Sequence, residues 1–374
     1  MKSKSFVILF VLTLFSFVFP KFGLTDEIVW TIKNSTMPTA RSSAEASVSG
    51  TDIYTLGGHG DSDTYSQSSG MRENEVYYTT SDSWEVKASI PYNRGCYGFA
   101  TAVVNNKVFM FGGGNPPGSG VYAYINKYDI STNTWTQDVA TLPYPVESPL
   151  AAAYNGYIYV FGGKSGAESG SSQPFRKITI KFDPNTYTYT SLAELPHYRG
   201  GGKALVFNNL IYLVGGSTVT QANAPYGTTD STPVVDVYNP ATNSWTTKGE
   251  VPIENGMAVL INGTIYLVAR DLSSAYKYDS TNDTWSSISS QFTDTTGGFN
   301  GSSCFGVVGN KIYVLGGNSD TTERLNTVIE GNFPSGCSTL ADVIAKFQAY
   351  KNGEATLKDV IECLKEWKGN GTDE

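Results

Sequence analysis

Short apolar runs that end in a pair of glycines recur along the chain. Such a run is typical of a buried β-strand bounded by a turn. The closing pairs begin at positions 57, 112, 162, 215, 269 and 316, so neighbouring runs lie 55, 50, 53, 54 and 47 residues apart. A period in this range predicts a propeller, a solenoid or an array. The runs are IYTLGG (Ile53–Gly58), VFMFGG (Val108–Gly113), IYVFGG (Ile158–Gly163), IYLVGG (Ile211–Gly216), IYVLGG (Ile312–Gly317) and IYLVAR (Ile265–Arg270), which lacks the glycines.

Five of the repeats also have an aromatic residue followed seven positions later by a second one. Turn-forming residues lie between the two, so each pair is expected to flank a hairpin turn. Turns rich in Asn and Gly, such as Asn155-Gly156, precede the apolar runs. Each repeat therefore predicts four short antiparallel strands, and such sheets repeated around an axis form a β-propeller. The aromatic pairs are Tyr77/Trp84, Tyr128/Trp135, Phe182/Tyr189, Tyr238/Trp245 and Tyr278/Trp285.

The two ends of the repeat region complete one another. Trp30 lies 27 residues before Gly57, as Trp135 lies 27 before Gly162, yet no apolar run precedes Trp30. The last repeat has sequence for three strands, ending near Ile329, and no Trp strand follows them. We therefore expect the N-terminal strand around Trp30 to join the last repeat and close the ring, which removes exposed strand edges.

These features resemble kelch repeats. The resemblance rests on the double glycines, the spaced Tyr and Trp residues and the segment MPTAR (Met37–Arg41), and it extends from Ile28 to Gly331. It implies an all-β fold, namely a six-bladed kelch β-propeller over residues 26–331 that the N-terminal strand closes.

After residue 331 the pattern changes from strands to helices. Residues 332–337 are expected to be a linker, residues 338–368 a small α-helical hairpin with one apolar seam, and residues 369–374 a disordered end. The hairpin resembles a dockerin in layout only, because it lacks Asp-rich calcium loops. We expect the seam to pack internally or against the propeller; the alternative is an attachment module. Cys337 and Cys363 are a candidate disulfide, which would stabilise so small an exported unit.

The N-terminal segment predicts a secretory signal over residues 1–25. Lys2 and Lys4 precede an unbroken apolar run from Phe6 to Phe19, which is short for a membrane span of about 20 residues. We expect the mature protein to be secreted or bound at the cell surface, without a membrane span; a retained anchor is the alternative. Five Asn-x-Ser/Thr sequons fit an exported surface, at Asn34, Asn262, Asn282, Asn300 and Asn370.

Composition narrows the partners and the chemistry. The net charge of -8 argues against nucleic acid and acidic membranes as partners, since both are anionic. Two histidines exclude a His-rich zinc centre, and none of the four cysteines forms a CxxC motif. We expect no cofactor and no metal, and a monomeric propeller whose partner is a glycan or a protein.

One face of the predicted disc carries the long loops after the glycine pairs and the crossings between repeats. Long loops on a rigid scaffold are the usual place for binding residues. The arginines among the candidates have a structural alternative, which we favour: salt bridges between repeats, since kelch repeats tend to carry Arg at this point. The candidate ligand-binding residues are Arg41, His59, Tyr65, Arg94, Tyr144, His197, Tyr198, Arg199 and Tyr226.

Two classes of function remain open. The first, which we favour, is an extracellular, non-catalytic recognition propeller that binds glycan or protein through its long-loop face, because no catalytic residue pattern stands out. The second is a carbohydrate-active enzyme of kelch type. A mutarotase or epimerase of this type would need a Glu/Arg pair near the axis, for which Glu147, Glu254 and Arg199 are available. A galactose-oxidase-like copper enzyme is disfavoured, because no obvious cysteine partner for a cross-linked tyrosine appears.

Overall fold

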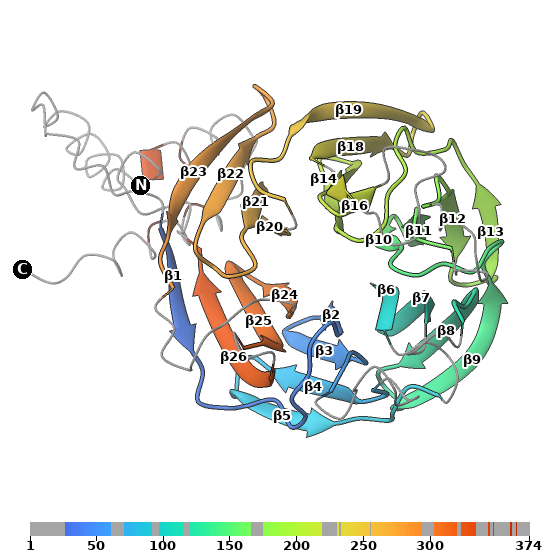
Figure 1. The fold of residues 1–374 in the computed structure, drawn as a ribbon, viewed down its shortest axis with the longest axis horizontal. Helices are drawn as coiled ribbons and strands as arrows, with labels where there is room; N and C mark the ends of the chain where they lie inside the picture. Colours follow the sequence, from blue (N-terminus) through green and yellow to red (C-terminus); the bar gives the residue numbers. More distant parts are fainter. Residues whose placement is uncertain are drawn as a thin grey trace, which may run out of the picture.

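The repeats form a ring of antiparallel sheets in the computed structural model (Figure 1). The structure describes residues 27–60, 71–91, 97–114, 120–165, 175–218, 230–231, 233–254, 256–292, 303–319 and 323–333, and five residues beyond them. Figure 1 shows the first strand of each repeat nearest the centre and the later strands progressively farther out. This is the arrangement of a β-propeller, as the repeats predict.

Four of the sheets that the structure describes have four strands each. The first contains β2 (Glu45–Ser49), β3 (Asp52–Leu56), β4 (Asn74–Tyr78) and β5 (Ser83–Val86). The second contains β6 (Tyr97–Val104), β7 (Lys107–Gly114), β8 (Tyr124–Asp129) and β9 (Thr134–Thr141). The third contains β10 (Leu150–Tyr154), β11 (Tyr157–Phe161), β12 (Thr179–Asp183) and β13 (Thr188–Ser191). The fourth contains β14 (Lys203–Phe207), β15 (Leu210–Val214), β18 (Val234–Asn239) and β19 (Ser244–Glu250), with β16 (Ser217–Thr218) and β17 (Asp230–Ser231) pairing above it.

The remaining strands form one eight-stranded sheet, in the order β20-β21-β22-β23-β1-β26-β25-β24. β1 is antiparallel to β26 from Val29 to Ile32, and its backbone pairs with β23 in parallel at its first two residues. The sheet therefore consists of two four-stranded units joined by a short parallel contact. The predicted closure by the strand around Trp30 is confirmed. The strands are β20 (Met257–Ile261), β21 (Thr264–Val268), β22 (Ala275–Asp279), β23 (Thr284–Ser290), β1 (Glu27–Ile32), β26 (Arg324–Asn332), β25 (Lys311–Asn318) and β24 (Cys304–Val308).

The glycine pairs let the chain cross from one sheet to the next at close range. Gly112, Gly162 and Gly316 all have a left-handed φ, between 59° and 68°. A Cβ on any of them would collide with the carbonyl of a crossing segment, that of Val146, Arg199 or Arg41 respectively. Only glycine combines this φ with so close an approach. The run without glycines ends instead in a tight turn, where the Leu272 amide donates to the Ala269 carbonyl (2.9 Å).

The spaced aromatic residues are neighbours on adjacent strands. Tyr238 pairs with Trp245 across β18 and β19, and their ring centroids lie 4.9 Å apart. The Tyr238 hydroxyl donates to Oδ1 of Asn243 (2.8 Å), and the indole of Trp245 donates to the carbonyl of Ala193, which follows the outer strand of the preceding sheet (2.9 Å). This pair thus packs its own hairpin and fastens it to the neighbouring sheet, and Trp135 makes the corresponding hydrogen bond to the Ala88 carbonyl (2.8 Å).

The C-terminal tail falls almost entirely outside the described residues. Five of its residues are described, and all are helical: Val343, Ile344, Phe347, Val360 and Leu364. The predicted hairpin, the linker after β26 and the disulfide between Cys337 and Cys363 stay predictions. In the described part of the chain no helix has the length and apolar character that a membrane crossing requires.

Candidate functional site

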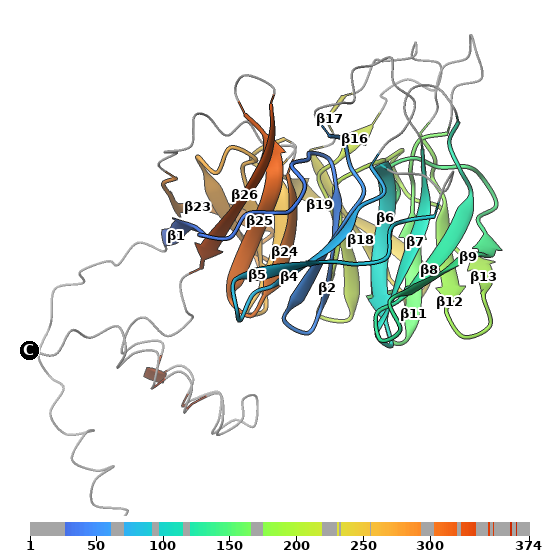
Figure 2. The same ribbon diagram turned by 90° about the horizontal axis from the view of Figure 1, so that it is seen from below.

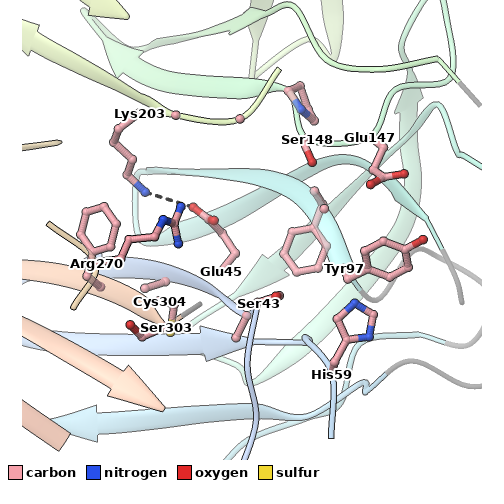
Figure 3. Close-up of a pocket in the computed structure, with 18 residues that line it drawn as sticks. Ser43, Glu45, His59, Tyr97, Glu147, Ser148, Lys203, Arg270, Ser303 and Cys304 are labelled. Carbon is pink, nitrogen blue, oxygen red and sulfur yellow. Dashed lines mark hydrogen bonds and ion pairs between the residues drawn. The ribbon is translucent and has the colours of Figure 1, made fainter. Parts of the chain in front are cut away.

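A polar pocket of about 440 Å³ opens at the centre of the ring. It lies at the end of the propeller where the first strands begin, which we call the pocket face. The end with the short turns between first and second strands is the turn face. The lining comes from β2, β6, β14 and β24 or the residues just before them, from the residues just before β10, and from His59 and Arg270, which follow β3 and β21 (Figure 3). Polar and titratable residues lining it are Ser43, Glu45, His59, Tyr97, Glu147, Ser148, Lys203, Arg270, Ser303 and Cys304.

The crossing segments present residues to the pocket by a repeated backbone device. The carbonyl of Arg41 accepts from Gly317 (2.9 Å), and the next residue, Ser42, pairs with His59. Ser43 then adopts a left-handed φ of 53°. Ser148 occupies the equivalent position after Glu147, with the same φ of 53°. Non-glycine residues held in this region are enriched at functional sites, because the surrounding fold must offset their strain.

One end of the pocket contains an ion pair. Lys203 Nζ lies 3.1 Å from Glu45 Oε1 and 5.2 Å from the centre of the Phe305 ring. Figure 3 shows the side chain of Arg270 beside this pair. Cys304 lines the same end but is buried, and burial raises the pKa of its thiol to about 12. A thiol with this pKa stays protonated at neutral pH and is a poor nucleophile.

The other end of the pocket contains Glu147 beside an aromatic pair. The rings of His59 and Tyr97 lie 4.6 Å apart. Glu147 is half-buried, and burial raises the pKa of its carboxyl above the ordinary value of 4.5, opposed by the charge of Lys164. Among the described residues, no hydrogen bond or ion pair reaches this carboxylate. The pocket therefore has an ion pair at its Lys203 end and, at its other end, a carboxylate on which the charge of Lys164 acts without forming an ion pair.

The arginines named from the sequence are placed in the interior. The Arg41 guanidinium is 2.5 Å from the Glu75 carboxylate and donates to Thr55 Oγ1 (2.8 Å). Arg199 Nη2 is 3.0 Å from Asp236 Oδ2. Their exposed fractions of 1% and 0% leave no donor at the surface. Each side chain joins the sheet that follows its crossing, while its carbonyl pairs with the sheet before it. These contacts have the geometry that the structural alternative requires, in which the arginines join neighbouring repeats instead of binding a ligand.

The other sequence candidates divide between the pocket and its surroundings. His59 lines the pocket, whereas His197 does not and instead places Nδ1 3.0 Å from Asp236 Oδ1. Tyr144 is 46% exposed, with the Arg176 guanidinium 4.8 Å from its ring centre. Tyr198 has Lys177 Nζ at 4.9 Å from its ring centre. Tyr65, Arg94 and Tyr226 lie outside the described residues.

Sequence reasoning missed most of the pocket. Glu45, Lys203 and Arg270 were not candidates, and Glu147 was named only for the enzyme alternative. These residues share a position in the repeat. Each lies within a few residues of the start of a repeat's first strand or of the end of its second strand. No group of three His, Cys, Asp or Glu residues able to hold a metal ion occurs in the described ranges.

The fold and the repeated glycine and aromatic contacts define a kelch-type β-propeller. A solved structure titled "Structure of YjhT" superposes with a TM-score of 0.62, covering 80% of this chain and 99% of that one. Its sequence identity is 15%, so this likeness concerns the fold alone. The family of Attractin/LZTR1 β-propellers matches residues 21–269, more than half of the chain. The chain belongs to this family of propellers.

The chain also resembles curated kelch proteins. The chain is 26% identical over 235 residues to Kelch-like protein terF of Aspergillus terreus, covering 59% of this chain and 50% of that protein. It is 25% identical over 275 residues to Kelch-like protein 25 of Xenopus tropicalis, covering 69% and 42%. The chain thus spans half or less of the length of these relatives.

Proposed function

We propose that the chain is a six-bladed recognition propeller that binds a protein partner on its pocket face. The sixth blade consists of β24, β25 and β26 with β1 as its outer strand, and β20–β23 form the fifth. A single ring then supplies the whole site, because blades far apart in sequence meet at the pocket. No second copy of the chain is needed.

The observation that carries this proposal is the convergence of polar side chains on the axial pocket. Side chains from separate blades surround it, and the short strands β16 and β17 extend beyond the fourth sheet on the same face (Figure 2). The turn face has two-residue turns such as Asn155-Gly156, which offer little surface for recognition. Concave sites with a few convergent polar groups are the usual binding sites of proteins.

A protein partner fits this face better than a glycan. Sugars are commonly held against open aromatic faces, and Tyr144 and Tyr198 were the described candidates for that contact. One face of each ring is already covered, by Arg176 and Lys177 respectively. Eight of the eighteen residues that line the pocket carry a charged or hydroxyl group, and such groups suit the side chains and backbone of a peptide segment.

We infer that this binding takes place outside the cell. The support is the signal-like segment before residue 26 together with the exposed sequon asparagines Asn34, Asn262 and Asn282. Expression with the native N-terminus in a secreting eukaryotic host should release a shortened chain into the medium. A chain that stays with the membrane fraction at full length would favour the retained anchor.

Site-specific photo-crosslinking tests the binding face. A benzophenone side chain replaces Tyr144 on a crossing to the pocket or, as the control, Tyr189 on the outer strand β13; the two are similarly exposed, at 46% and 40%. In cultures of the source organism we expect protein adducts from position 144 only, and their loss when His59→Trp narrows the pocket. Equal adducts from both positions would contradict the proposal.

A second candidate function has one observation in its favour. Glu147 and Arg270 line the same pocket, which supplies a Glu/Arg pair near the axis, whereas Arg199, named from the sequence for this role, is buried. Burial raises the pKa of Glu147 above 4.5, which is the direction that favours a carboxyl group as a general acid and base. The test is anomer interconversion of N-acetylneuraminic acid followed by NMR. Catalysis lost in Glu147→Gln would support the enzyme, and a rate equal to that of buffer would exclude it.

A further inference from the structure

We propose that the Glu147 end of the axial pocket binds a cationic side chain, Arg or Lys, projecting from the protein partner. This inference rests on the proposed function and specifies the chemistry of the segment that enters the pocket.

The first support is the position of the Glu147 carboxylate. Its Cγ packs over Gly98, where an added Cβ would lie only 2.7 Å away, so glycine at this position leaves the side chain its space. The Ser148 amide donates to the Gly98 carbonyl, which holds the adjoining backbone. The carboxylate lines the pocket without a hydrogen-bond or ion-pair partner among the described residues. A partly desolvated charge of this kind gains most from an opposite charge brought in by a ligand.

The second support is the chemistry around this carboxylate. Figure 3 shows Tyr97 and His59 beside Glu147, and Ser148 next to it. Hydroxyl oxygens accept hydrogen bonds, and an aromatic face attracts a cation within about 6 Å. The donors of a guanidinium or an ammonium group would therefore find acceptors and a ring in one place.

The third support is the distribution of positive charge. Lys203 is paired with Glu45 at 3.1 Å, and Figure 3 places Arg270 beside that pair, at the end of the pocket away from Glu147. A cation at Glu147 thus binds away from Lys203 and Arg270, and the positive charge that already acts on this carboxylate is that of Lys164, whose ammonium lies 5.3 Å from the centre of the Phe175 ring. The net charge of -8 also attracts a basic partner during diffusional approach.

This model of binding requires an ionised carboxylate. Burial raises the pKa of Glu147 above 4.5, so protonation begins at a higher pH than for an exposed glutamate. Affinity for a cation should fall as the pH drops through that raised pKa, which the charge of Lys164 keeps from rising further.

Calorimetric titration with two matched probes tests the inference. N-acetylarginine amide carries the cation, and N-acetylcitrulline amide has nearly the same shape without the charge. At pH 7.5 and low salt we expect the arginine probe to bind at least tenfold more tightly than the citrulline probe. Glu147→Gln should remove that difference, because one charge-assisted hydrogen bond accounts for about a factor of ten.

The control variant is Glu254→Gln, the same substitution on an exposed glutamate that does not line the pocket. It should keep the tenfold preference, and both variants should melt within about 2 °C of the wild type. Equal binding of the two probes, or an unchanged preference in Glu147→Gln, would overturn the inference. In that case, crosslinks from position 144 that His59→Trp abolishes would still support the proposed function.

Discussion

Trp30 lies directly across from Gly331 in the ladder that closes the propeller, and its six-membered ring fills the space over that glycine. The indole Nε1 donates to Ser290 Oγ on β23 (3.1 Å), and the ring meets Phe292 edge-on with centroids 6.4 Å apart. One side chain therefore links the outer strand of the last blade to the outer strand of the blade before it.

The first prediction concerns this pair. Gly331→Ala should destabilise the protein, since the new methyl group would overlap the Trp30 ring, and overpacking costs about 1–3 kcal/mol. Trp30→Ala should cost about 3 kcal/mol through lost packing. In the Trp30→Ala background the alanine at 331 should cost less, because the ring is gone and only the close contact with Ile312 Cγ2 remains. Urea denaturation, monitored by circular dichroism, measures the free energy of unfolding of the wild type, the two single variants and the double variant. Additive losses in this free energy would show that the two residues do not interact.

The second prediction concerns the buried acid Asp236. It accepts from Arg199 (3.0 Å) and from Thr247 Oγ1 (2.9 Å), and its exposed fraction is 0%. Asp236→Asn leaves the Arg199 charge uncompensated, and we expect a loss of about 3–5 kcal/mol in the free energy of unfolding. Arg199→Ala should have a comparable effect.

Replacing both residues by apolar ones, as Arg199→Met with Asp236→Leu, should cost less than either single change, because no buried charge remains. Partner binding should fall only in proportion to lost stability. A binding loss in Arg199→Ala at unchanged melting temperature would instead assign this arginine to ligand contact.

The third prediction is a pH dependence at the closing strand. Burial tends to raise the pKa of Glu330, but hydrogen bonds from Lys311 and Asn332 and the charges of Lys311 and Lys33 lower it overall, below the ordinary 4.5. A lowered pKa stabilises the folded protein above pH 4.5, and this contribution is lost as the pH falls through the folded value. The wild-type melting temperature should drop across that window.

Glu330→Gln should melt about 2 °C lower at pH 7, through the loss of about 1 kcal/mol, and should show a shallower decline below pH 4.5. Scanning calorimetry between pH 7 and pH 3 measures both effects. Parallel curves for the two proteins would mean that Glu330 titrates alike in the folded and unfolded states.

The fourth prediction separates two roles of Asn243. Its Oδ1 accepts from the Tyr238 hydroxyl (2.8 Å) and from the Ala193 amide (2.9 Å), and its φ is 49°. Asn243→Ala loses both hydrogen bonds and strains the backbone, at a total cost of about 2–3 kcal/mol. Asn243→Gly should recover the backbone part, about 1 kcal/mol.

Asn243→Asp should be close to wild type, because Asp82 and Asp283 make the same tyrosine contact in other blades. None of the three variants should alter crosslinking from position 144, since Asn243 lies in a turn on the far side of the blade from the pocket. Equal melting temperatures for the alanine and glycine variants would rule out the backbone contribution.

The fifth prediction concerns Ser148, whose left-handed backbone is shared by glycine at the equivalent position Gly201, with φ of 68°. Ser148→Gly relieves strain and adds unfolded-state entropy, so the two effects should cancel to within about 1 kcal/mol. Ser148→Val should destabilise by more than about 2 kcal/mol, since a branched Cβ tolerates this φ poorly. Scanning calorimetry distinguishes the two variants by their melting temperatures. Identical melting temperatures would show that the backbone at position 148 is not strained.

The strand repeats, the aromatic pairs and the closing role of Trp30 could be predicted because they depend on local, periodic patterns. A glycine pair ends a strand, and a residue seven positions on from Tyr238 returns beside it through a short hairpin. The repeat whose apolar run lacks the glycine pair was also recognisable, because the spacing of the other runs predicts its position. None of these inferences needed to know which distant residues meet.

The pocket and the burial of the arginines depend on contacts between residues that are far apart in the sequence. Only the tertiary structure decided which residues make those contacts. Arg199 is placed by Asp236, which lies 37 residues further along, and the sequence cannot tell a buried carboxylate partner from a waiting ligand. Glu147, Lys203 and Arg270 share one cavity because the ring brings the ends of separate blades to a common axis. Their position follows from how the blades are arranged around that axis, a relation that no local pattern of residues records.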